Sequence, residues 1–327
     1  MKIIVQKYGG KLVEDKIKME KVAKSIISSY KQGNMVVAVI SATGNTTDEL
    51  NDRIFEITNK PNQREVDVVL SSGEQIAIGL LSIMINNMGY KSISMTGWQT
   101  GILTNNKYTD ANIENINTEI IKYYLNKGYI VIVAGFQGVD KNNNITTLGR
   151  GGSDTTATEL AAYLEADVCE IFKDTKSIYT ADPKIVTTAK KIKNINYMDM
   201  MELSKMGAKI LSYKSVEYAK NHNLKLVIKS VEENEIGTAI NNKKTDNNFI
   251  IVSCTKKRLN DYLDIISFII NNKKNLDKAN LIIKGTMKAN GIKDYIINNS
   301  IENVISIILN NKNSDYMLKQ IHDNLII

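Results

Sequence analysis

Apolar and polar residues alternate in blocks along residues 1–240 and predict strands and helices in turn. Short, continuous apolar runs such as Met35 to Ile40 are typical of strands buried on both faces of a sheet. We expect strands at Lys2 to Gln6, Met35 to Ile40, Ser92 to Met95, Tyr129 to Ala134, Val168 to Lys173 and Leu224 to Ile228. This alternation is the pattern of an α/β domain.

Between these runs, apolar residues recur every three or four positions, which predicts amphipathic helices. The first helix should begin after Asp15, its expected N-cap, with Met19, Val22 and Ile26 on one face. Further helices are expected at Thr47 to Ile57, Val66 to Met88, Asn115 to Lys127, Asp154 to Leu164 and Tyr213 to His222.

The rhythm changes after the polar run Asn241 to Asn248, which is the best candidate for a domain boundary. The following segments predict a strand, a helix, two strands, a helix and a last short strand: Phe249 to Ser253, Leu259 to Ile270, Ala279 to Lys284, Val304 to Leu309, Ser314 to Leu325 and Ile326-Ile327. This order matches a small α+β, ferredoxin-like module. We therefore expect one domain over residues 1–240 and a second over 249–327.

Composition excludes several classes of protein. With 43% hydrophobic and 24% charged residues the chain can bury a core, and no apolar run approaches the ~20 residues of a membrane helix. Two cysteines and two histidines are too few for a disulfide framework or a histidine-based metal centre, so we expect no protein-built metal site and a cytoplasmic location. The net charge of +7 comes from dispersed lysines, which favours a solvated surface or attraction of an anionic substrate over nucleic-acid binding.

Two segments at strand ends could hold an anion. In Lys7-Tyr8-Gly9-Gly10 the glycines let a phosphate approach backbone N–H groups, and Lys7 supplies a positive charge. An ordinary turn with a surface lysine is the commoner reading of such residues. Ser41 to Glu49 runs from a strand into a helix whose N-terminus can hold an anion, although Thr46 and Glu49 also fit a capping box.

The segment Thr147 to Thr156, TLGRGGSDTT, is the most specific. Its arginine offers a bidentate fork for a carboxylate, and its three glycines allow close backbone approach. In Phe172 to Pro183, Tyr179 suits stacking on a base, an ordinary half-buried aromatic position or a plain loop. Lys209, after Gly207-Ala208, reads by default as a surface lysine.

Taken together, these segments resemble the aspartate kinases of the amino acid kinase family. They occur in the family's order: KYGG, SATGNTTDEL, SSGEQ, GWQTGILT, AGFQGVD, TLGRGGSDTTA, the stretch from Asp174 to Pro183, and MGAKIL. The resemblance covers residues 1–240 and implies an open, largely parallel sheet between helix layers. It also implies transfer of the γ-phosphate of ATP, with Mg²⁺, to the side-chain carboxylate of L-aspartate, in amino-acid biosynthesis of the lysine, threonine and methionine type.

The resemblance implies roles around the transferred phosphoryl group. Lys7 would stabilise it beside Gly9 and Gly10, and Asp154 would organise Lys7 and Lys209 around it. A carboxylate acceptor is already ionised at pH 7, so this chemistry needs positive charge and positioning rather than a general base. The chain's lysines, arginines and glycine-rich loops suit that requirement.

Other roles concern the two substrates. Ser41, Thr47 and Ser153 would line the aspartate site, Glu74 would meet the amino group of aspartate, and Arg150 would clamp its α-carboxylate. The nucleotide would be contacted by Gly9, Gly10, Asp174, Tyr179, Lys184 and Lys209.

The sequence also departs from the family. Lys11-Leu12 stands where Thr-Ser is usual, Lys173 where Thr is usual, and Lys184 where Arg is usual. These changes leave open two rivals: a kinase for a different amino acid or carboxylate, and a weakly active pseudokinase that regulates a partner.

The C-terminal region departs most. Family members commonly carry two ACT modules, whereas residues 249–327 leave room for about one, and Thr255 to Arg258 replaces the usual Pro-Gly turn. We expect either an atypical ACT-like module or an oligomerisation appendage that binds no effector. A homodimer through this module would use strand edges or a helix face formed by Tyr262, Ile265, Ile266 and Ile269.

Overall fold

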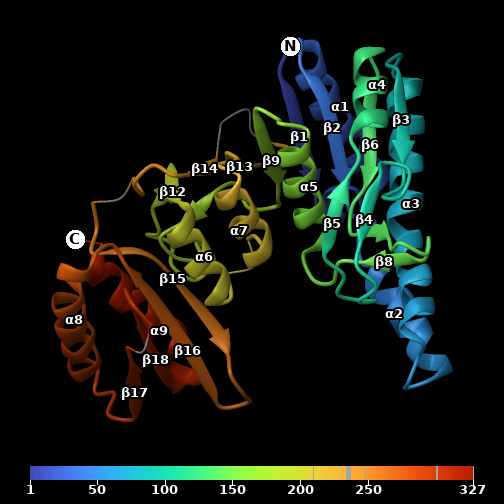
Figure 1. Cartoon of the computed structure of the whole chain (residues 1–327). Helices are drawn as coiled ribbons and strands as arrows, with labels where there is room; N and C mark the ends of the chain where they lie inside the picture. The colour runs from blue at the N-terminus through green and yellow to red at the C-terminus, as the bar shows by residue number, and fades with distance from the viewer. Residues whose placement is uncertain (209, 233–236, 247, 300, 327) are drawn as a thin grey trace. The chain divides into compact units, whose positions relative to one another are not determined.

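The computed structural model of the chain describes all residues except 209, 233–236, 247, 300 and 327 (Figure 1). It contains two compact units: Met1–Lys176 with Lys214–Gly237, and Ser177–Tyr213 with Thr238–Ile327. These units do not follow the boundary expected near residue 240, because residues 177–213 group with the C-terminal region.

A parallel sheet forms the centre of the first unit (Figure 1). Its strands run in the order β13-β9-β1-β2-β6-β3, and every neighbouring pair is parallel. Their bounds are β1 (Ile3–Tyr8), β2 (Met35–Ile40), β3 (Ser92–Met95), β6 (Ile130–Ala134), β9 (Val168–Phe172) and β13 (Leu226–Lys229). The expected strands and the largely parallel sheet are confirmed, because apolar runs of this length must be covered on both faces.

Helices cover both faces of this sheet. On one face, α1 (Lys16–Lys31) and α3 (Gln63–Asn87) pack against apolar residues of β2 and β6 in a single core cluster. On the other face lies α5 (Gly152–Tyr163). Asp15 caps α1 as expected, with its carboxylate accepting from the Lys18 amide at 2.8 Å. The other helices that begin in or border this unit are η1 (Gly10–Leu12), α2 (Thr46–Ile57), α4 (Glu119–Asn126) and α7 (Tyr213–Asn221).

Among the described residues, α3 is the one helix whose length and composition would allow it to cross a membrane. Half of its most apolar stretch is buried within the protein. Ala77, Ile78, Leu81 and Ile85 pack into the core with α1 and the sheet, which explains the apolar composition as that of a core helix. The expectation that no apolar stretch reaches this length is therefore corrected.

A small second sheet adjoins α3, with the strand order β5-β4-β7-β8. Its strands are β4 (Ile102–Thr104), β5 (Ile113–Ile116), β7 (Gln137–Val139) and β8 (Ile145–Thr147). The fully buried carboxylate of Asp67 on α3 accepts from the amide of Thr109 and from the amide and hydroxyl of Thr147. Asp67 thereby holds the end of β8, from which the loop carrying Arg150 continues. The expected helix from Asn115 is shorter, because residues up to Ile116 belong to β5.

The second unit is built around an antiparallel sheet with the order β15-β16-β18-β17. The strands β15 (Ile251–Arg258), β16 (Leu263–Ile270), β17 (Tyr295–Asn298) and β18 (Val304–Asn310) share an apolar core with α8 (Leu276–Ala289) and α9 (Asn311–Leu325). The unit also contains β10 (Ile178–Tyr179), β11 (Lys191–Ile192), β12 (Asn194–Asn196), α6 (Tyr197–Lys205), β14 (Thr238–Asn241) and η2 (Lys273–Asn275).

The predictions for two segments of this unit are wrong. Residues 259–270 were expected to form a helix, but Leu263–Ile270 is a strand paired on both sides, and a run rich in isoleucine suits that position. Residues 279–284 were expected to form a strand, but they lie in α8, where Ala279, Ile283 and Met287 are buried four residues apart on one face. The predicted helix face with Tyr262 and Ile265 therefore does not exist. The last short strand predicted at residues 326–327 is not formed at Ile326, which is the C-cap of α9, and residue 327 lies outside the described residues.

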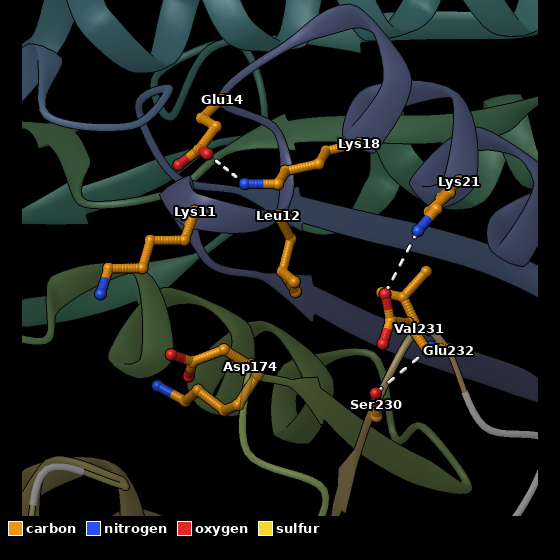
Figure 2. Close-up of a pocket in the computed structure, with 10 residues that line it drawn as sticks. Lys11, Leu12, Glu14, Lys18, Lys21, Asp174, Ser230, Val231 and Glu232 are labelled. Atoms are coloured by element: carbon orange, nitrogen blue, oxygen red, sulfur yellow. Dashed lines mark hydrogen bonds and ion pairs between the residues drawn. The ribbon is translucent and has the colours of Figure 1, made fainter.

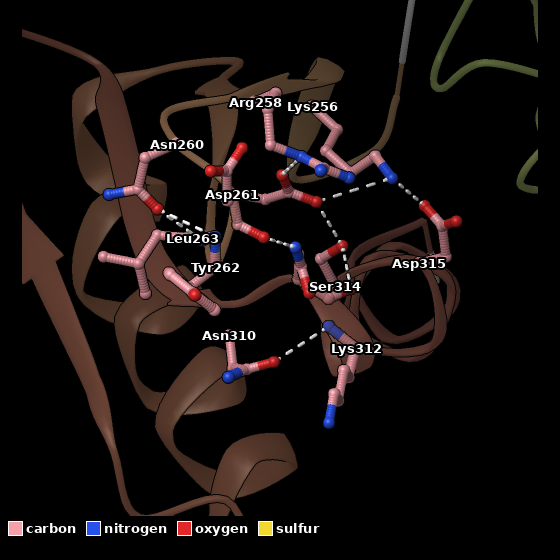
Figure 3. A network of polar contacts seen from close by, with 12 residues as sticks. Lys256, Arg258, Asn260, Asp261, Tyr262, Leu263, Asn310, Lys312, Ser314 and Asp315 are labelled. Carbon is pink, nitrogen blue, oxygen red and sulfur yellow. Dashed lines mark hydrogen bonds and ion pairs between the residues drawn. The ribbon is translucent and has the colours of Figure 1, made fainter.

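A buried carboxylate joins α9 to the β15–β16 hairpin (Figure 3). Asp264 is 1% exposed and accepts from Arg258 Nε and Ser314 Oγ, both at 2.6 Å. Burial alone would raise the pKa of Asp264, but the hydrogen bonds from Ser314 and Arg258 hold the pKa below its usual value. The network fixes the start of α9 on the sheet.

Candidate active site

The carboxyl ends of β1 and β2 bring two of the expected loops into direct contact. The Gly44 amide donates to the Gly10 carbonyl at 3.0 Å. A Cβ atom on Gly10 would lie 2.3 Å from the Ala42 carbonyl oxygen, so only glycine fits there. The backbone of the Lys7–Gly10 turn is thus packed against the Ser41–Gly44 loop.

Lys7 and Asp154 form a buried ion pair, with Lys7 Nζ 2.7 Å from Asp154 Oδ1. Each residue is 5% exposed. Asp154 lies in the first turn of α5, which begins after Gly151 in the left-handed conformation at φ 74°. Burial lowers the pKa of Lys7 although Asp154 opposes the shift. Burial would also raise the pKa of Asp154, but the nearby lysines hold it below its usual value, so the carboxylate stays ionised.

Lys173 is a second partner of Asp154, and sequence reasoning did not place it in the site. Its Nζ lies 2.9 Å from Oδ2 and 3.3 Å from Oδ1 of Asp154. Lys173 directly follows β9, the parallel neighbour of β1, so both lysines leave the same edge of the sheet. Its position after a strand was visible in the sequence, but the pairing of β9 with β1 was not. Lys209, the expected second partner, lies outside the described residues.

Glu74 approaches the same loops from α3. Its Oε1 accepts from the Ala42 amide at 3.0 Å, whereas its buried Oε2 has no hydrogen-bond partner in the described part of the chain. The residue is 3% exposed, and burial raises the pKa of Glu74 to about 7, with Lys7 acting in the opposite direction. A buried carboxylate oxygen with no partner suits a cationic ligand.

The remaining expected substrate residues are less closely gathered. Arg150 is exposed between Gly149 and Gly151, and no hydrogen bond or ion pair engages it within the described residues. Ser153 is 8% exposed, and its side chain packs against Gly135. Ser41 and Thr47 are half-buried. The prediction of a capping box is wrong, because Thr46 is the first residue of α2 and Asn45, not Thr46, is the N-cap.

A cavity of about 450 Å³ opens beside these residues in the first unit (Figure 2). It is lined by Lys11, Leu12, Glu14, Lys18, Lys21, Lys173, Asp174, Ser230, Val231 and Glu232. Lys18 and Lys21 are paired with glutamates, while Lys11 has no ion-pair partner in the described ranges (Figure 2). Asp174, an expected nucleotide residue, is exposed in the cavity wall.

Two expected nucleotide residues belong to the second unit. The carbonyl of Tyr179 accepts from the Ser253 hydroxyl at 2.7 Å, and the amide of Lys184 donates to the Asp182 carboxylate at 2.9 Å. Their roles remain predictions. Across the described residues no group of three or more His, Cys, Asp or Glu side chains is arranged to hold a metal ion.

Several aspartokinases are similar in sequence. The aspartokinase of Geobacillus stearothermophilus is 48% identical over 252 residues, which cover 77% of this chain and 62% of the relative. The aspartokinase of Corynebacterium glutamicum is 45% identical over 241 residues, covering 73% of this chain and 57% of the relative. The chain thus spans about three fifths of the length of the curated relatives it matches.

Solved structures support the same fold. Aspartokinase III of E. coli, in complex with aspartate and ADP, has a TM-score of 0.84 at 18% identity, covering 99% of this chain and 100% of that chain. The aspartate kinase from Synechocystis has a TM-score of 0.67 at 30% identity, covering 96% of this chain and 54% of that chain. The family model described as the amino acid kinase family matches residues 2–230. With this match over most of its length, and with the sheet and loops described above, the chain belongs to the amino acid kinase family.

Proposed function

We propose that the chain is an aspartate kinase, which transfers the γ-phosphate of ATP to the side-chain carboxylate of L-aspartate and forms 4-phospho-L-aspartate. The observation that supports the proposal most strongly is that one site contains both a buried carboxylate and a buried ammonium group. Glu74 presents a buried carboxylate oxygen that has no partner among the described residues, and Lys7 presents a buried ammonium held by Asp154. An α-amino acid brings the ammonium that Glu74 lacks, and a nucleotide brings the phosphate that Lys7 suits. The similarity to aspartokinases supports aspartate as the amino acid.

The chemistry follows from charge placement. The acceptor carboxylate is ionised at pH 7 and needs no base. Glu74 holds the α-ammonium, and Arg150 closes on the α-carboxylate from its exposed loop. Lys7 faces the phosphoryl group, where its charge stabilises the negative charge that develops on the leaving oxygen of ADP. Gly9 and Gly10 leave room for phosphate oxygens at the backbone.

Mg²⁺ is a proposed cofactor, and the described residues offer no dedicated cage for it. Both carboxylate oxygens of Asp154 already accept from lysines. The hard cation would therefore be carried largely by the phosphates of the nucleotide, as Mg²⁺ commonly is.

The roles of the two domains, the cellular location and the pathway are also proposals. The catalytic domain would span residues 1–240, and the roles of Tyr179, Lys184 and Lys209 in nucleotide binding stay predictions. The ACT-like region over residues 249–327 would mediate homodimer formation. The enzyme would act in the cytoplasm, in amino-acid biosynthesis.

A hydroxamate-trapping assay with ATP and Mg²⁺ tests the proposal. Acyl phosphates react with hydroxylamine, so product is expected with L-aspartate and should require ATP. A panel of other amino acids and dicarboxylates is run in parallel, with Lys7→Met as the inactive control. A product with another acceptor, and none with aspartate, would indicate a kinase of different specificity. No product with any acceptor would remove the enzymatic reading.

A further inference from the structure

Two lysines share one buried carboxylate in the first unit. Lys7 reaches Oδ1 of Asp154 at 2.7 Å, and Lys173 reaches Oδ2 at 2.9 Å. Lys7 alone would neutralise Asp154. Lys173 therefore adds one positive charge for which this cluster supplies no counter-charge.

A surplus charge that is largely removed from solvent is costly unless an anion completes it. Glu74 does not serve this purpose, because it is close to half protonated near pH 7 and its Oε2 remains without a partner in the described chain. The cluster is thus arranged for an anionic ligand that binds on the side where Lys173 is accessible.

The two lysines differ in access. The side chain of Lys173 is 17% exposed, compared with 7% for Lys7. Lys173 lines the cavity of about 450 Å³, and so does Lys11, which has no carboxylate partner in the described ranges. Figure 2 shows contacts that occupy Lys18 and Lys21 but none on Lys11. The cavity therefore presents two ammonium groups that are available to an anion, one of them anchored on Asp154.

We infer that Lys173 is a phosphate-binding residue of this site. Lys173 pairs with Asp154 in the free protein and donates to a phosphate oxygen of the nucleotide when the nucleotide is bound. Lys11 is a second cation of the same cavity. The inference rests on the proposed function for the nature of the ligand, a nucleoside polyphosphate. It assigns a role to a residue beyond the Lys7–Asp154 pair.

Calorimetric titration of the full chain with ADP, pyrophosphate and adenosine, without aspartate, tests this role. Lys173→Met keeps the length of the side chain and removes its charge, and is expected to weaken ADP and pyrophosphate binding at least tenfold while leaving adenosine binding unchanged. Lys173→Arg should retain most of the ADP affinity. The matched control is Lys24→Met, which removes an exposed lysine paired with Glu20 on α1.

Two results would overturn the inference. One is ADP affinity of Lys173→Met within twofold of the unmodified chain. The other is an equal loss of adenosine and ADP binding, which would mean that Lys173 only supports the fold around Asp154. If Lys173→Met unfolds at lower temperature, Lys173→Arg decides, since a phosphate-binding role requires the charge and tolerates the guanidinium. Because aspartate is absent, loss of ADP affinity would sustain this inference even if the hydroxamate assay showed no aspartate kinase activity.

Discussion

Lys7 Nζ lies 2.7 Å from Asp154 Oδ1, which joins the end of β1 to the first turn of α5 across the face of the parallel sheet. Both residues are almost fully buried. Because Lys173 also contacts Asp154, removal of Lys7 does not leave a buried carboxylate without a partner. The function of Lys7 can therefore be tested with little disturbance of the fold.

We expect Lys7→Ala to lower kcat by roughly a hundredfold or more, because its charge matters most as negative charge shifts onto the leaving oxygen. The KM values should change little. Steady-state kinetics with a coupled ADP assay measures both. A kcat within a few-fold of the unmodified chain would mean that Lys7 only pairs with Asp154.

Arg150→Ala should weaken aspartate binding far more than ATP binding. Arg150 has no partner to lose within the described residues, so the change should leave the fold intact. Loss of a bidentate, charge-assisted contact should cost about 2–4 kcal/mol in kcat/KM for aspartate. Arg53→Ala, on the exposed surface of α2, is the matched control. An unchanged KM for aspartate would sink the assignment of Arg150.

Aspartate affinity should rise with pH because Glu74 must ionise to bind an ammonium group. Burial raises the pKa of Glu74 to about 7, so most of the carboxyl is protonated at pH 6 and ionised at pH 8. The ionised fraction, and hence the affinity, should grow roughly tenfold over this range. Equilibrium dialysis of aspartate with saturating ADP measures it. In Glu74→Gln the affinity should be low and flat with pH; an equally steep profile would exclude Glu74 as the titrating group.

Gly10→Ala should disrupt the site, since its Cβ would lie 2.3 Å from a backbone carbonyl oxygen. We expect at least tenfold lower activity and a lower Tm. The matched control is Gly79→Ala on α3, where a Cβ meets nothing within 4 Å. That change should stabilise the helix by about 0.5–1 kcal/mol. Equal effects of the two changes on activity would show that the turn tolerates a side chain.

The second unit should lose stability as the pH falls. His322 is fully buried, with Nε2 2.8 Å from Thr180 Oγ1. Burial lowers the pKa of His322, so the unfolded chain, with a pKa of about 6.5, takes up a proton that the folded unit resists. The free energy of unfolding should therefore fall below about pH 6.5. Urea unfolding at pH 7.5 and 5 measures this.

The corresponding variant is His322→Gln, which should flatten the pH dependence. Exposed His222 supplies the control, His222→Gln, which should keep it. If both variants lose stability with falling pH as steeply as the unmodified chain, another group is responsible.

Some of the site was visible as local sequence, and some was not. The motif residues Lys7, Glu74 and Asp154 were predicted to act together, and the structure brings them to one place. Lys173 was seen only as an unusual residue after a strand. Its contact with Asp154 depends on β9 lying beside β1, and the order of strands in a sheet is not encoded in any one segment.

By itself, the sequence determined the strands of the parallel sheet, the capped helix after Asp15 and the family, because continuous apolar runs, caps and glycine-rich motifs are local signals. Only the tertiary structure decided the C-terminal region. Leu263–Ile270 is a strand because it pairs with β15 and β18, and residues 279–284 are helical because Ala279 and Ile283 pack on that sheet. Short apolar segments fit either conformation, so the contacts that bury them choose between strand and helix.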